Sequence, residues 1–187
     1  MPKKLILLIG APGSGKSTDA KLIAEKHDGK ISSYSTGDLI KEEIKKGTGI
    51  GSIAKSFVEK GDLVPTQIVV ELIVDAVKNA PTEIVMLDGF PGKEKQLKYF
   101  CDYIFNNDKI NILSVLEIKV NDVLAKERWL ASGRSDEIFE HEMISYKESL
   151  SEIEAHYNNK HILKVINGER ALDLVIADID TYLESKI

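Results

Sequence analysis

Apolar runs alternate with amphipathic stretches along the whole chain. Short continuous apolar runs are typical of strands buried in a parallel sheet, whereas apolar residues that repeat every three or four positions are typical of helices. The helical repeat is clear at residues 50–58 and again at residues 69–77. The pattern predicts five strands between such helices, at residues 5–9, 31–34, 83–88, 111–118 and 162–166.

Strands that alternate with helices favour an α/β fold, in which right-handed crossovers build a parallel sheet with helices on both faces. Ligands of such folds bind beyond the carboxyl ends of the strands. The chain has 187 residues, of which 43% are hydrophobic and 29% charged. This composition fits one globular domain, residues 1–187, with a sizeable core.

Charge and cysteine content exclude several kinds of partner. The net charge is −5 and no basic stripe follows the sequence, so we expect no nucleic-acid partner. The single cysteine, Cys101, excludes an internal disulfide and a zinc site with several thiolates. The apolar run after Lys3 and Lys4 leads into a glycine-rich loop without a signal cleavage site, and no stretch approaches a membrane span. We therefore expect a cytoplasmic protein without a membrane partner.

Residues 10–17 read GAPGSGKS, a full match to the phosphate-loop pattern G-x-x-x-x-G-K-[ST]. The loop follows a predicted strand and precedes a helix-forming stretch, as that pattern requires. Its glycines let successive N–H groups turn toward phosphate oxygens, and the positive end of the next helix adds to the attraction. In this pattern Lys16 reaches the β- and γ-phosphates, and the hydroxyl of Ser17 is a ligand of Mg²⁺. The sequence therefore predicts a nucleoside triphosphate site.

A second candidate is Asp88, which ends the predicted strand 83–88 and is followed by Gly89, Phe90 and Pro91. A carboxylate at the end of a neighbouring strand can hold the Mg²⁺ of a phosphate loop through the water shell of the ion. Taken alone, an aspartate in this place is as consistent with a turn. The phosphate loop nearby favours the role in Mg²⁺ binding.

Six motifs follow one another along the chain: GAPGSGKST, YSTGDLIK, KGDLVP, LDGFP, KERWLASGRSDE and INGER. Their order resembles that of the adenylate kinases, a family of nucleoside monophosphate kinases, in its short-lid form. The resemblance implies a P-loop NTPase-type five-stranded parallel sheet with helices on both faces. It also implies a small monophosphate-binding arm at about residues 35–64 and a short lid at about residues 131–136.

The same resemblance implies a reaction, ATP + AMP ⇌ 2 ADP, with Mg²⁺ as cofactor. It implies small-molecule nucleotides as partners and a monomeric enzyme. Thr36, in STGD, resembles the AMP-specific members of the family, since UMP/CMP kinases usually carry a smaller residue there. No local feature reads the purine of the triphosphate, so the choice of ATP over GTP depends on the resemblance alone.

Single residues receive roles from the resemblance as well. On the ATP side it implies phosphate binding by Gly13, Ser14, Gly15, Lys16, Ser17 and Thr18, with Arg128 and Arg170 near the base. On the AMP side it implies Thr36, Lys41, Asp62, Leu63, Val64, Gly89, Phe90, Pro91, Gly92, Gln96 and Arg134. Lys16, Asp88 and Arg134 would be the catalytic residues, with Arg134 bridging phosphates from the lid. Without the flanking motifs, each arginine would be read as a solvated surface charge.

The chain departs from the family pattern at three positions where the family carries arginine. These positions are Gly92 after LDGFP, Lys41 after STGDLI, and Glu142 on the helix that follows the lid. Arginine grips phosphate with two parallel hydrogen bonds, so each replacement weakens the hold on a phosphoryl group. Two alternatives stay open for this reason. One is a nucleotide-binding protein that has lost catalysis, and the other is a kinase for an acceptor less anionic than AMP, such as a sugar or nucleoside hydroxyl.

Overall fold

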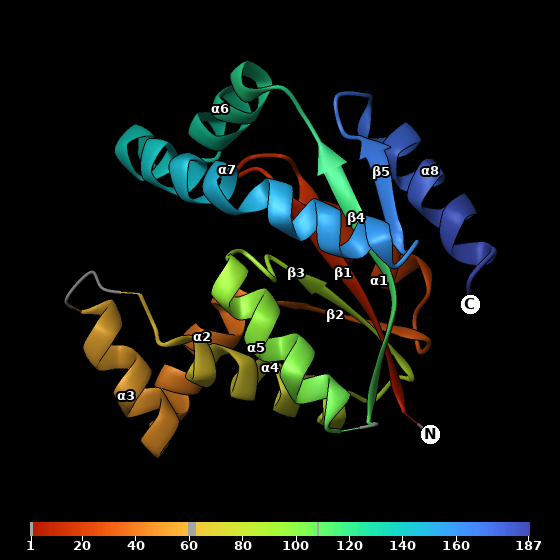
Figure 1. Ribbon diagram of the computed structural model, residues 1–187. Helices are drawn as coiled ribbons and strands as arrows, with labels where there is room; N and C mark the ends of the chain where they lie inside the picture. Colours follow the sequence, from red (N-terminus) through yellow and green to blue (C-terminus); the bar gives the residue numbers. More distant parts are fainter. Residues whose placement is uncertain (1, 60–62, 108) are drawn as a thin grey trace.

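Five parallel strands form the centre of the computed structural model, which describes residues 2–59, 63–107 and 109–187. They are β1 (Lys3–Gly10), β2 (Ile31–Ser35), β3 (Ile84–Asp88), β4 (Ile110–Lys119) and β5 (Leu163–Asn167). Their order across the sheet is β2-β3-β1-β4-β5 (Figure 1). Each of the five predicted strands is confirmed, with ends within two residues of those expected.

Helices connect the strands and cover both faces of the sheet, as predicted. They are α1 (Lys16–Lys26), α2 (Thr36–Lys46), α3 (Gly49–Val58), α4 (Thr66–Asn79), α5 (Glu94–Phe105), α6 (Asp122–Ala131), α7 (Asp136–Asn159) and α8 (Leu172–Glu184). Several begin where a polar side chain accepts a hydrogen bond from the first turn, namely Ser35 for α2, Thr48 for α3 and Asn121 for α6. Of the helices described, none combines the length and apolarity that crossing a membrane requires.

The central strand β1 separates two hydrophobic cores. Successive side chains of a strand point to opposite faces, so Leu5 and Leu7 pack toward α4, α5 and α7, whereas Ile6 and Leu8 pack toward α1 and α8. All four side chains have no exposed surface. The phosphate loop and the turn after β3 therefore leave a rigid sheet at neighbouring points, because β1 and β3 are paired directly with Leu8 opposite Asp88.

A third, smaller cluster lies at the carboxyl edge of the sheet, beneath α6 and α7. It consists of Ala11, Val120, Ala125, Trp129, Phe139 and Met143. The predicted lid, residues 131–136, lies beside this cluster, since α6 ends at Ala131 and α7 begins at Asp136. The lid segment is thus a short turn between two helices, next to the end of β1.

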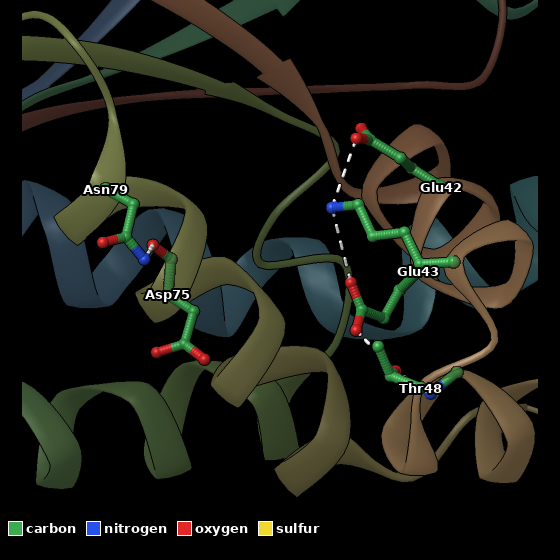
Figure 2. Close-up of polar contacts among 7 residues, drawn as sticks. Glu42, Glu43, Thr48, Asp75 and Asn79 are labelled. Atoms are coloured by element: carbon green, nitrogen blue, oxygen red, sulfur yellow. Dashed lines mark hydrogen bonds and ion pairs between the residues drawn. The ribbon is translucent and has the colours of Figure 1, made fainter.

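The described part of residues 35–64 contains the helix pair α2 and α3, which lies on the side of the molecule opposite β5 and α8 (Figure 1). Figure 2 shows Glu43 and Thr48 at the joint of the pair, where the Thr48 hydroxyl donates to Glu43 Oε1 at 2.6 Å. Lys46 adds an ion pair with Glu42 at 3.2 Å. Gly47 ends α2 in the left-handed conformation. The Thr48–Glu43 hydrogen bond therefore links the start of α3 to α2.

Candidate active site at the carboxyl ends of the strands

The loop between β1 and α1 packs tightly against α6. The φ of Gly13 is +79°, and a Cβ atom there would lie 2.1 Å from the carbonyl oxygen of Ala125, so only glycine fits. Within the described residues no side chain caps α1, so no side chain occupies its N-terminal end, although the Thr18 N–H donates to the carbonyl oxygen of Gly15 at 2.9 Å. N–H groups at the start of a helix attract anions. The loop thus has the backbone geometry of a phosphate-binding site.

Lys16 begins α1 and folds its side chain back over this loop. Its Nζ donates to the carbonyl oxygen of Ala11 at 3.1 Å. Burial lowers the pKa of Lys16, while the carboxylates of Asp88 and Glu142 act in the opposite direction. The ammonium group is therefore poorly hydrated, and phosphate oxygens entering the loop would be strong partners for it.

Ser17 and Asp88 meet between α1 and the end of β3. The Ser17 hydroxyl donates to Asp88 Oδ2, whereas Oδ1 of the same buried carboxylate has no hydrogen-bond partner among the described residues. A free carboxylate oxygen beside a hydroxyl is a suitable pair of hard ligands for Mg²⁺ or its water shell. Within the described residues no group of three or more His, Cys, Asp or Glu side chains could hold a metal ion. These two residues fit Mg²⁺ when phosphates and water supply the remaining ligands.

Arg128 and Arg170 line a cavity on the α8 side of the loop. Arg128 Nη1 donates to the carbonyl oxygen of Gly168 at 2.8 Å, and Arg170 pairs with Asp178. Both arginines therefore line a space that adjoins the phosphate loop, and their contact with a base stays a prediction. The cavity also contains Asp19, a buried carboxyl whose pKa is raised to about 6 by burial.

A second cavity lies between the phosphate loop and the lid turn. Lys16, Arg134 and Glu142 all line it, together with Trp129. The guanidinium of Arg134 stacks over the Trp129 ring, with its central carbon 4.5 Å from the ring centroid. Arg134 therefore shares a cavity with the phosphate loop, as its predicted role requires. Glu142 brings a negative charge to the same space.

On the monophosphate side, the predicted residues surround the turn after β3. The Thr36 hydroxyl donates to the carbonyl oxygen of Asp88 at 3.1 Å, and Gln96 Oε1 accepts the N–H of Gly92 at 2.8 Å. Phe90 is fully buried and packs edge-on against Phe100, so only its backbone can face a ligand. Thr36, Gly92 and Gln96 thus lie around this turn, which also contains Gly89 and Pro91, and their role toward a monophosphate stays a prediction.

Four further residues predicted for the AMP side, Lys41, Asp62, Leu63 and Val64, belong to the segment predicted as the arm. The side chain of Lys41 is 80% exposed and its Nζ lies 3.5 Å from Asp38, so it points to solvent. Leu63 is exposed, whereas Val64 packs on the core beside α4. Asp62 lies outside the described residues. The contribution of these residues to an acceptor site stays a prediction.

Sequence reasoning missed two residues of the site, Asp19 and Trp129. Asp19 lies in the first turn of α1, directly after the phosphate loop. A carboxylate so close to a predicted anion site could have marked it as a candidate site residue. Trp129 was visible as the single tryptophan of the chain, within a predicted site motif. Its place between loop and lid depends on packing, which the motif does not encode.

Comparison with known proteins identifies relatives over the full length of the chain. The family model described as "Adenylate kinase" matches residues 8–162. The adenylate kinase of a Sulfurovum species is 41% identical, with 99% of this chain and 100% of the relative covered. That of a Nitratiruptor species is 43% identical over 99% and 97%, and that of Nautilia profundicola is 42% identical over 98% of each chain.

Proposed function

The chain belongs to the adenylate kinase family of nucleotide phosphotransferases, and we propose that it transfers the γ-phosphoryl group of ATP reversibly to AMP, giving two ADP. The observation that carries this proposal is the meeting of Lys16, Asp88 and Arg134 around one glycine-rich loop. Each contributes a different element of phosphoryl transfer. We include in the proposal that the enzyme acts as a monomer in the cytoplasm.

In this proposal an oxygen of the AMP phosphate attacks the γ-phosphorus in line. The bond from the γ-phosphorus to the bridging oxygen breaks, and the electron pair stays on the β-phosphate of the departing ADP. Lys16 and Arg134 stabilise negative charge on the moving group, which is the main demand of this chemistry. No protein side chain acts as a nucleophile.

The start of α1 and the end of β3 would hold the metal. When bound, Mg²⁺ neutralises charge on the β- and γ-phosphates. Ser17 would supply a hydroxyl, and Asp88 would supply Oδ1, which has no hydrogen-bond partner in the part of the chain that is described. Thr36 anchors the end of β3 through its hydrogen bond to the Asp88 backbone, which keeps this carboxylate in position.

We further propose that turnover is slower than in family members that carry arginine at the positions of Gly92, Lys41 and Glu142. Gly92 offers no cation, Lys41 points to solvent, and Glu142 lowers the positive charge of the cavity that Lys16 lines. Each of these changes weakens the hold on phosphate oxygens. The weakening concerns the acceptor and the transferring group more than the binding of ATP, because the phosphate loop itself is complete.

The test is ADP formation by the purified protein with ATP, Mg²⁺ and a panel of acceptors that includes AMP, a nucleoside and a sugar. We expect AMP-dependent ADP formation, and its loss in Lys16→Met. Lys45→Met is the matched control, because it removes an exposed charge from α2 and leaves the loop intact. ATP binding without turnover of any acceptor would establish a protein that has lost catalysis. Preference for a neutral acceptor would establish a different kinase, and either result overturns the proposal.

A further inference from the structure

Trp129 is the only tryptophan of the chain and is buried in the small cluster at the carboxyl edge of the sheet. We propose that Trp129 is a positioning residue that holds Arg134 over the triphosphate cavity and ties the lid to the phosphate loop. This inference rests on the proposed function, in which Arg134 contacts the phosphates. Three contacts of Trp129 support it, each to a different part of the site.

The first contact is with the phosphate loop. The Cβ atom of Trp129 lies 3.3 Å from the place that a Cβ atom on Gly13 would occupy, and Ala125, one turn earlier on α6, closes the same space. The backbone of the loop therefore lies directly against the α6 face that carries Trp129. A shift of α6 would therefore displace the phosphate loop, because a close-packed contact has no free volume to absorb the movement.

The second contact is with the end of the lid. The indole Nε1 donates to the carbonyl oxygen of Ser135 at 2.8 Å, and the ring packs against Phe139 on α7 with 5.9 Å between ring centroids. A buried tryptophan N–H needs a partner of this kind. Because Trp129 is on α6 and Ser135 directly precedes α7, this hydrogen bond joins the lid turn to α6.

The third contact is with Arg134 itself, whose guanidinium lies over the indole face. An aromatic face orients an arginine without using any of its five N–H donors, which stay free for phosphate. In the part of the chain that the structure describes, Arg134 forms no ion pair, whereas Arg170 pairs with Asp178. An arginine that is ordered before binding loses less side-chain entropy when the ligand arrives. Trp129 thus orients the lid cation and leaves its N–H donors to the ligand.

A double-mutant cycle on the affinity for Mg·ATP tests this inference. The dissociation constant is measured by calorimetry for the parent, Trp129→Leu, Arg134→Met and the double variant. We expect Trp129→Leu to raise the dissociation constant of Mg·ATP by about threefold to fivefold in the parent. In the Arg134→Met background the same change should leave the dissociation constant nearly unchanged, because the guanidinium that Trp129 orients is gone. Trp129→Phe keeps an aromatic face and should restore part of the loss.

Phe139→Leu is the matched control, since it removes a ring from the same cluster without touching Arg134. Its effect should be equal in both backgrounds. Tryptophan fluorescence adds a direct signal, because Mg·ATP should change the emission of Trp129 more in the parent than in Arg134→Met. If Trp129→Leu does not fold, the cycle is built with Trp129→Met, which removes the aromatic face while its flexible side chain fills much of the space.

Equal effects of the Trp129 change in the two backgrounds would overturn the inference and leave Trp129 as a packing residue. The cycle depends on Mg·ATP binding and not on an acceptor. A parent that binds Mg·ATP but makes no ADP from AMP would therefore contradict the proposed function, while the cycle would still decide the role of Trp129. A parent that does not bind Mg·ATP would overturn both.

Discussion

Replacing Gly92 with arginine would add a cation to the turn between β3 and α5. A Cβ atom at Gly92 meets only ordinary contacts, 3.7 Å to Gln96 Oε1 and 3.7 Å to the Gly89 carbonyl oxygen, and its backbone is outside the left-handed region. The hydrogen bond from Gly92 to Gln96 uses the backbone N–H, so it is retained. We therefore expect Gly92→Arg to fold like the parent and to place its side chain next to the acceptor side of the site.

The expected gain follows from the strength of one charged hydrogen bond, about 1.5 to 3 kcal/mol. Such an energy corresponds to a factor of roughly 10 to 150 in rate when the bond forms in the transition state. Gly92 is exposed, and solvent screens charges at exposed positions, so the lower end applies. We expect about a tenfold rise in kcat/KM for AMP, with little change in the KM for ATP, because Gly92 follows β3 and does not line the cavity of the phosphate loop, which follows β1.

The assay is AMP-dependent ADP formation at saturating Mg·ATP. Gly92→Gln is the matched control, because it adds a long polar side chain without charge and should give less than a twofold gain. An unchanged kcat/KM in Gly92→Arg would refute the reasoning. It would mean that other cations, such as Lys93 and Lys95, already supply the charge that the turn lacks.

Three further predictions follow from the geometry of the site and the core. Gly13→Ala should weaken Mg·ATP binding at least tenfold, since its Cβ atom would collide with α6. The control is Gly47→Ala, which is also at positive φ, but whose Cβ atom would meet no atom of the described residues within 4 Å. It should leave binding unchanged in the same titration. Glu142→Gln should tighten Mg·ATP binding about fivefold, on the basis of roughly 1 kcal/mol of relieved repulsion, and Glu148→Gln on the same helix should not. Burial, reinforced by Glu154, raises the pKa of Glu117 to about 7. The folded protein then holds more protons than the unfolded chain between about pH 4.5 and 7, so Glu117 lowers the free energy of unfolding as pH rises through this range, by up to about 3 kcal/mol. Urea unfolding at pH 5 and pH 8 should show a smaller pH dependence for Glu117→Gln, and parallel curves for the two proteins would contradict this.

Most of the secondary structure of this protein could be predicted from the local sequence. Strands buried on both faces must be apolar throughout, and helices with one buried face must repeat every three or four residues, so both patterns are visible without a structure. The phosphate loop is local in the same sense, because its turn and the helix that follows are formed by consecutive residues. The position of Asp88 beside this loop could be predicted for a related reason, since strands that are parallel and adjacent end at the same edge.

Contacts between distant segments could not be read in this way. Arg128 meets Gly168 across 40 positions, and Lys41 points to solvent despite its place in a motif. Glu117 is buried on β4, and among the described residues neither of its carboxylate oxygens has a hydrogen-bond partner. The packing of α6 decides the surroundings of Arg128, and the place of β4 in the sheet decides those of Glu117. A side chain's charge and shape belong to the residue itself, but the dielectric, the partner and the direction it faces depend on whichever remote segments pack around it. For this reason the sequence determined which residues could bind a nucleotide, and only the tertiary structure decided that Trp129 stands behind Arg134 and that Glu142 faces the same cavity.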